Sequence, residues 1–183
     1  IKHILFVCTG NICRSPFAEG LLEKLVQKNG INDIVADSAG LLALPGNSAT
    51  GLAQKIAAEY DVDLSGHTAK YVEKDIVDGS DLILVMENSH AKNLLTAFPE
   101  AEGKIFLIRH FAGFGSKNRA VADPYGLNYE AYRFCFLDIQ DCVSGLAGHI
   151  KIARYSINFC DLRSNKSDPN LCACLEKLFR PRF

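Results

Sequence analysis

The chain has 183 residues, of which 48% are hydrophobic and 22% are charged, and its formal net charge is −1. This composition is typical of a soluble globular protein, and the near-neutral charge gives no reason to expect nucleic acid as a partner. The length fits one domain with an appended segment.

The sequence has neither a signal peptide before the first expected strand nor an apolar run of about 18 residues. We therefore expect no transmembrane segment and a cytoplasmic location, in which the seven cysteines stay reduced. The cysteine spacing does not match a zinc site, because one residue separates Cys172 from Cys174 and no second pair matches them. We expect no metal and no cofactor.

Hydrophobic patterning predicts strands that alternate with helices. We expect strands at 3–8, 34–38, 82–86 and 104–108, and helices at 15–29, 50–60, 88–97 and 129–150. Gly30 is expected to end the first helix. The continuous apolar run at 82–86 is typical of a parallel strand covered on both faces. The alternation therefore predicts an α/β fold with a doubly wound parallel sheet.

The carboxyl ends of the expected strands carry polar and reactive residues. Cys8, Ser38, Glu87 and the loop at 109–126 all follow strands. Ligands bind open parallel sheets outside these carboxyl ends, so we expect a single site there.

The segment that begins at Cys8 and ends at Pro16 lies between the first strand and the first helix. Six backbone N–H groups, from Thr9 to Arg14, can surround one anion, and the positive end of the following helix points to the same place. The segment therefore predicts a phosphate-binding loop with a thiol at its base.

The residue types in this loop fit nucleophilic chemistry on phosphorus. A free cysteine titrates near pH 8.5, and a helix N-terminus with a nearby cation lowers that value, so we expect Cys8 to react as a thiolate. Arg14 supplies a planar fork for two phosphate oxygens. Gly10 is expected to let the backbone turn and approach the ligand closely. Ser15 is expected to cap the helix or to donate a hydrogen bond to the Cys8 sulfur. A structural role for Cys8, as a buried cysteine at a strand end, is the alternative.

The reaction also needs a proton donor for the leaving group. Asp123 is the candidate, since it precedes Pro124 in the loop at 111–126. The alternative is an inert Asp-Pro turn. As general acid, Asp123 would protonate the departing oxygen, and it would then activate water as general base.

The segment Ile4–Glu19 and the downstream motif Asp123-Pro124-Tyr125-Gly126 together resemble the active-site segments of the low-molecular-weight protein tyrosine phosphatases. The resemblance covers about residues 1–150. It implies a four-stranded sheet of order 2-1-3-4 flanked by helices. It also implies a metal-independent phosphatase that hydrolyses phosphotyrosine in proteins, and small aryl phosphates, through a cysteinyl-phosphate. Inorganic phosphate would be the product.

The resemblance also implies supporting roles. Asn11 would hold the loop in shape, with Ser38 and His67 tied to it and to Ser15. Tyr125 and Leu44 would form the rim of the pocket. The phosphate-binding residues would be Thr9, Gly10, Asn11, Ile12 and Cys13.

Cys13 would form a reversible disulfide with Cys8 that protects the nucleophile, whereas a buried filler is the alternative. Glu87 stands where the family more often has aspartate.

Other activities on this scaffold stay open. The aliphatic Ile12 favours phosphotyrosine, whereas the related protein arginine phosphatases have threonine there. An arsenate reductase would need further cysteines for a disulfide relay; residues 81–100 contain none, and Cys160, Cys172 and Cys174 are the remaining candidates. A non-catalytic phosphopeptide-binding module is the alternative from another class.

Residues 151–183 differ from the rest in charge, with seven basic against three acidic residues. The sequence predicts a phosphatase domain at 1–150 and a basic, cysteine-containing extension at 151–183, with a short helix at 171–179. The extension either packs on the domain surface or serves as a partner site, a membrane-surface patch or a redox element.

Overall fold

Four parallel strands form one sheet, in the order β2-β1-β3-β4. The computed structural model describes residues 2–117 and 119–155. The strands are β1 (Lys2–Cys8), β2 (Ile34–Gly40), β3 (Leu82–Val85) and β4 (Ile105–Leu107). β1 pairs with both β2 and β3, so that Ile4 lies opposite Ala36 on one side and Leu82 on the other. The predicted fold class and strand order are confirmed.

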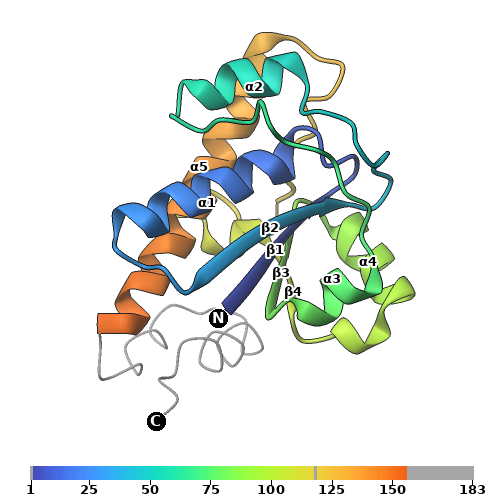
Figure 1. Ribbon diagram of the computed structural model, residues 1–183, viewed down its shortest axis with the longest axis vertical. Coiled ribbons are helices and arrows are strands. Elements are labelled where there is room, and N and C mark those ends of the chain that lie inside the picture. Colours follow the sequence, from blue (N-terminus) through green and yellow to red (C-terminus); the bar gives the residue numbers. More distant parts are fainter. Residues whose placement is uncertain (1, 118, 156–183) are drawn as a thin grey trace.

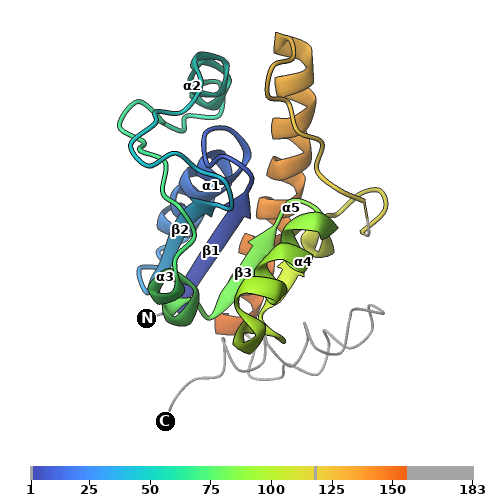
Figure 2. The ribbon, with the colours of Figure 1, turned by 90° about the vertical axis from the view of Figure 1, so that its right-hand side faces the viewer.

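Helices cover both faces of this sheet (Figures 1 and 2). The helices α1 (Arg14–Lys28), α2 (Gly51–Ala58) and α5 (Tyr129–Tyr155) pack on one side, and α3 (Lys74–Gly79) and α4 (Asn88–Ala97) pack on the other. Two short 3-10 turns, η1 (Pro99–Ala101) and η2 (Ile108–Phe111), flank β4. No helix within the described ranges is long and apolar enough to cross a bilayer.

Side chains of β1 alternate between two buried layers. Phe6 and Cys8 belong to the layer shared with α1 and α5, whereas Val7 belongs to the layer shared with α3 and α4. Phe17 of α1 stacks on Phe136 of α5, with ring centroids 3.9 Å apart. This packing fixes the start of α1 directly behind the end of β1, where Cys8 lies.

The strands and helices predicted between residues 3 and 150 all exist, with boundary shifts of a few residues. β2 continues to Gly40 rather than ending at Ser38, and β4 is shortened by the turn η2. Gly30 follows α1 with φ of +68°, and its N–H donates to Gln27 while Ile31 donates to Val26, as in a Schellman motif. Patterning missed α3, because this six-residue helix buries only Val77 and has no repeating apolar stripe.

The predicted domain boundary at residue 150 falls inside α5, which continues to Tyr155. The division into 1–150 and 151–183 stays a prediction. The expected helix at 171–179, together with Cys160, Cys172 and Cys174, lies outside the described residues.

Close packing between α5 and the segment that leads to Asp123 gives a prediction about stability. A Cβ added at Gly145 would lie 1.9 Å from the carbonyl oxygen of Phe111, whereas one added at Gly148 would meet nothing within 4 Å. We expect Gly145→Ala to lower the free energy of unfolding by about 1–3 kcal/mol, because backbone must move. Gly148→Ala, in the same helix, should raise it by about 0.5–1 kcal/mol through helix propensity. Chemical denaturation measures both, and equal effects would contradict the described contact.

Candidate active site

The segment between β1 and α1 directs its carbonyl groups outward. The backbone N–H groups of Leu41, Leu42 and Thr50 donate to the carbonyls of Cys8, Thr9 and Ile12 at 3.0, 2.8 and 2.9 Å, respectively. His67 Nε2 lies 2.7 Å from the carbonyl oxygen of Asn11. Among the described residues, the N–H groups of Thr9, Gly10, Ile12 and Cys13 have no protein acceptor. N–H groups of this kind at the N-terminus of the 15-residue helix α1 suit an anionic ligand. We propose below that they bind phosphate, and we call residues 8–14 the anion-binding loop.

The Cys8 sulfur faces polar groups although the residue is only 2% exposed. Its Sγ lies 3.0 Å from Ser15 Oγ and accepts from the N–H of Asn11 at 3.3 Å. Ser15 Oγ accepts from Asn11 Nδ2 at 2.9 Å, and its single proton is shared between two neighbouring acceptors, the Cys8 sulfur at 3.0 Å and the Ala39 carbonyl at 3.4 Å. The sulfur therefore lies within hydrogen-bond distance of polar groups from both the loop and the first turn of α1.

Of the two roles expected for Ser15, the structure has the contact with the Cys8 sulfur and lacks the helix cap. Ser15 lies inside the first turn of α1, and the N-cap is Cys13, which makes no side-chain capping bond. Within the loop, Asn11 has a positive φ of +54°. Asparagine tolerates this left-handed conformation better than most residues.

Asn11 holds the loop from beneath. It is fully buried, and its Nδ2 donates to both Ser15 Oγ and Ser38 Oγ, the latter at 2.8 Å. Its Oδ1 accepts from the N–H of Lys70 at 2.8 Å. Ser38 and His67 therefore both contact Asn11, where the sequence analysis expected them.

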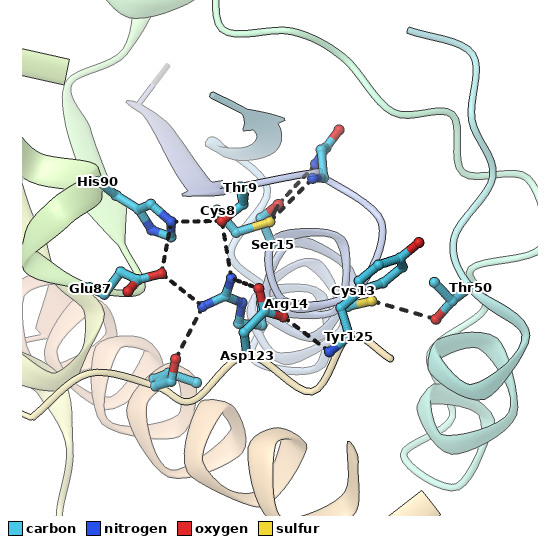
Figure 3. A network of polar contacts seen from close by, with 12 residues as sticks. Cys8, Thr9, Cys13, Arg14, Ser15, Thr50, Glu87, His90, Asp123 and Tyr125 are labelled. Atoms are coloured by element: carbon cyan, nitrogen blue, oxygen red, sulfur yellow. Dashed lines mark hydrogen bonds and ion pairs between the residues drawn. The ribbon is translucent and has the colours of Figure 1, made fainter. Parts of the chain in front are cut away.

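Arg14 lies at the centre of the site, only 2% exposed, with its guanidinium surrounded by acceptors (Figure 3). Nη1 donates to Glu87 Oε1 at 3.3 Å and to the Val121 carbonyl at 3.2 Å. Nη2 donates to Thr9 Oγ1 at 3.3 Å and to Asp123 Oδ2 at 2.5 Å. The guanidinium therefore joins the loop after β1, the N-cap residue of α4 and the segment that carries Asp123.

Hydrogen bonds hold the segment that carries Asp123 at two places, one next to the end of β3 and one at α5. The Val121 N–H donates to Met86 at the end of β3, at 2.9 Å. Further back, the buried Arg109 donates to Asp138 of α5 at 2.8 Å and to the Phe114 carbonyl at 2.7 Å. Asp123 itself remains 44% exposed. A carboxylate that is anchored near the guanidinium but open to solvent can exchange a proton with a bound substrate.

Cys13 points toward a different part of the molecule from Cys8. Its Sγ lies 3.3 Å from Tyr132 Oη and 3.5 Å from Thr50 Oγ1, and burial raises the pKa of this thiol above its ordinary value. Both Cys8 and Cys13 are free thiols. The protective disulfide between them stays a prediction.

Exposed apolar side chains lie in the segment after β2 and in the segment after Asp123. Tyr125 and Leu44, the expected rim residues, are 64% and 68% exposed. Leu42 is 73% exposed and donates its N–H to Thr9, so it is a further rim candidate that the sequence analysis missed.

Glu19 is another residue whose place the sequence did not predict. Its Oε2 accepts from Ser38 Oγ at 2.5 Å, which extends the chain of contacts that runs from Cys8 through Ser15 and Asn11. Burial, with a smaller contribution from Asp37, raises the pKa of Glu19 to about 7, against the lowering effect of the hydrogen bond from Ser38. Because Glu19 takes a polar position of the expected helix 15–29, the sequence pattern alone does not reveal its contact with Ser38.

Gly40 is the third unpredicted element of the site and generates a prediction. A Cβ at Gly40 would lie 2.7 Å from the Thr9 carbonyl oxygen and 2.8 Å from the Asn11 nitrogen. Gly40→Ala must therefore displace the anion-binding loop, and we expect kcat/KM to fall by about 100-fold. Gly79→Ala, where an added Cβ meets nothing within 4 Å, is the control and should stay active. Unchanged kinetics in Gly40→Ala would contradict the described approach.

The raised pKa of Glu19 predicts a pH dependence of stability. A carboxyl whose folded-state pKa lies above its unfolded value favours folding only while it is protonated. Its contribution is therefore lost as the pH rises from about 4.5 to about 7. Glu19→Gln removes this loss, so the variant should gain about 1–3 kcal/mol relative to the native chain across that range. Denaturation curves at several pH values measure the difference, and parallel pH profiles would refute the prediction.

Comparisons with known proteins agree with this geometry. The family model described as low molecular weight phosphotyrosine protein phosphatase matches residues 3–155. A low molecular weight protein-tyrosine-phosphatase from Acinetobacter johnsonii is 38% identical over 149 residues, which is 81% of this chain and 98% of the relative.

Two solved structures have the same fold. The low molecular weight protein tyrosine phosphatase from T. tengcongensis has a TM-score of 0.74 and 37% identity, covering 81% of this chain and 99% of its own. The YwlE arginine phosphatase from Geobacillus stearothermophilus has a TM-score of 0.77 and 29% identity, covering 86% of this chain and 98% of its own. Since the family model and a relative of nearly equal length both match across the described domain, the chain belongs to the low-molecular-weight protein tyrosine phosphatase family.

Proposed function

We propose that this protein hydrolyses phosphotyrosine in proteins, and small aryl phosphates, through a cysteinyl-phosphate on Cys8. Membership in the family makes the protein a phosphatase, with a phosphoprotein as substrate and inorganic phosphate as product. The observation that supports the mechanism best is the network at Arg14, which brings Asp123 into the site of the Cys8 loop.

Substrate binding exchanges one anion for another at Arg14. The guanidinium holds Asp123 at Nη2, and a phosphoryl group takes this place with two oxygens on the planar fork. The inward N–H groups of the loop hold the remaining oxygens. Displaced from Arg14, the Asp123 carboxyl is free to take up the proton that the leaving group needs.

The first chemical step transfers the phosphoryl group to sulfur. The Cys8 thiolate attacks phosphorus in line, the S–P bond forms, and the P–O bond to the tyrosine breaks. Asp123 gives its proton to the departing phenolic oxygen. The charge on the equatorial oxygens is stabilised by Arg14 and the loop N–H groups, which do the electrostatic work that a metal does in other phosphatases.

The second step hydrolyses the cysteinyl-phosphate and regenerates the free enzyme. Asp123, now a carboxylate, takes a proton from a water molecule as that water attacks phosphorus, and the S–P bond breaks. Ser15 and the Asn11 N–H donate to the departing sulfur, which eases its release as a thiolate. Inorganic phosphate then leaves, and the Arg14–Asp123 ion pair can form again.

Ile12 and the exposed rim support tyrosine as the phosphorylated residue. A β-branched aliphatic side chain narrows the mouth of the loop around a flat ring, and Tyr125 and Leu44 offer apolar contact. Protein arginine phosphatase is the second candidate, because chains described by that name match both in sequence and in structure.

The remaining alternatives have less support. A binding module without catalysis would not need the nucleophile, the fork and the acid together. Arsenate reduction needs accessible relay cysteines, and those of the described part of α5, Cys135 and Cys142, are buried. Free thiols at Cys8 and Cys13 fit the reducing cytoplasm that we propose as the location.

A panel of phosphotyrosine, phosphoarginine and phosphoserine peptides tests the proposal. We expect a preference for phosphotyrosine. Cys8→Ser should abolish turnover and keep inorganic phosphate binding, because the loop donors remain. Asp123→Asn should lower kcat/KM, which reports the first step alone, by about 10²–10⁴-fold on phosphotyrosine, and less on p-nitrophenyl phosphate, whose leaving group needs no proton.

Each of these measurements has one result that would contradict the proposal. Native turnover by Cys8→Ser would exclude the covalent mechanism, and equal losses of Asp123→Asn on both leaving groups would exclude its role as acid. A preference for phosphoarginine would replace the proposed substrate by the second candidate.

A further inference from the structure

His90 completes a closed ring of contacts that includes the Arg14 guanidinium, with Thr9 and Glu87 between them (Figure 3). It is the third residue of α4 and is only 4% exposed. Its Nε2 lies 3.0 Å from Thr9 Oγ1 and 3.0 Å from Glu87 Oε1. These two oxygens are acceptors for the two terminal nitrogens of Arg14, Thr9 for Nη2 and Glu87 for Nη1. One imidazole nitrogen therefore contacts both side-chain oxygens that orient the fork from this side.

The contacts assign the tautomer of this ring. A carboxylate oxygen only accepts, so Nε2 must carry the proton that lies toward Glu87 and Thr9. Within the described part of the chain, the buried Nδ1 has no hydrogen-bond partner. Burial lowers the pKa of His90, and the charge of Arg14 lowers it as well, against the opposing effects of Glu87 and Asp123. The ring is therefore neutral, with its proton on Nε2.

This assignment also fixes the role of the Thr9 hydroxyl. Thr9 Oγ1 faces two groups that can only donate to it, the His90 N–H and the Arg14 Nη2. With both lone pairs engaged, the hydroxyl proton of Thr9 must be donated elsewhere. Its neighbour Nη2 is the nitrogen that releases Asp123 when a phosphoryl oxygen arrives.

We propose that His90 is a positioning residue that, through Thr9 and Glu87, fixes the plane of the Arg14 fork and turns the Thr9 hydroxyl into a donor for the bound phosphoryl group. The inference rests on the proposed function for its catalytic consequence. The ring of contacts itself needs no turnover to be measured. The buried Nδ1, which has no partner among the described residues, lowers stability, and the two contacts of Nε2 offset part of that cost.

A comparison of two variants tests this role. His90→Leu removes the donor, and we expect it to weaken inorganic phosphate binding and to lower kcat/KM, each by about 10- to 100-fold. His90→Gln places an amide N–H near the position of Nε2 and should recover most of both. A loss that follows thermal stability alone, with no rescue by glutamine, would overturn the proposal.

A double-mutant cycle separates positioning from packing. Thr9→Val replaces the hydroxyl by a methyl group of similar size, and Thr9→Ser keeps the hydroxyl as the matched control. If His90 acts through Thr9, the double variant with His90→Leu and Thr9→Val should show a smaller fold-loss in kcat/KM than the two single fold-losses multiplied together. Additive losses, or full activity in Thr9→Val, would refute the relay.

The native protein offers a test that does not depend on activity. Imidazole ¹⁵N spectra near neutral pH should show His90 protonated on Nε2 and bare on Nδ1, with the Nε2–H signal shifting when inorganic phosphate is added. The opposite tautomer, or a doubly protonated ring, would overturn the assignment. Because this measurement uses phosphate and no substrate, its failure is distinguishable from a failure of the proposed phosphotyrosine activity.

Discussion

The site depends on one buried cation. The Arg14 guanidinium accepts no hydrogen bonds and is almost fully removed from solvent, so every edge of it must meet an acceptor. Two carboxylates, a hydroxyl and a carbonyl meet this need, and they come from three separate parts of the chain. Because the buried guanidinium needs acceptors, the site also suits an anionic ligand, whose oxygens can accept the same hydrogen bonds. Asp123 is the more exposed of the two carboxylates, at 44% against 34% for Glu87, and in the proposed mechanism it is the acceptor that a phosphoryl group replaces.

The anion-binding loop is held by its surroundings more than by its own sequence. Amides from the segment after β2 and from the start of α2 hold its carbonyls outward, which leaves its N–H groups for the ligand. Asn11 supplies the left-handed turn, and Gly40 lets β2 approach the loop backbone closely. Preorganised donors of this kind stabilise developing charge without reorganising during the reaction. In the proposed mechanism, the contacts that hold the loop at the edge of the sheet therefore contribute to catalysis.

Sequence reasoning identified what depends on local pattern and chain order. The apolar runs gave the strands, and the rule that parallel strands end at one edge placed Cys8 and the Asp123 segment in one site. Sequence reasoning did not identify the residues that reach the site only because separate helices and strands pack closely together. Glu19 had the spacing of a surface position, Gly40 looked like a strand terminus, and His90 had no motif of its own. Register and packing, which a single sequence does not display, bring these three to the loop.

A crystal structure with orthovanadate, which mimics the transferring phosphoryl group, tests the central claim most directly. The account predicts vanadium bonded to the Cys8 sulfur, two equatorial oxygens on the Arg14 fork, and Asp123 released from the guanidinium to face the apical oxygen. An ion pair between Arg14 and Asp123 that stays intact while vanadate binds elsewhere would contradict it.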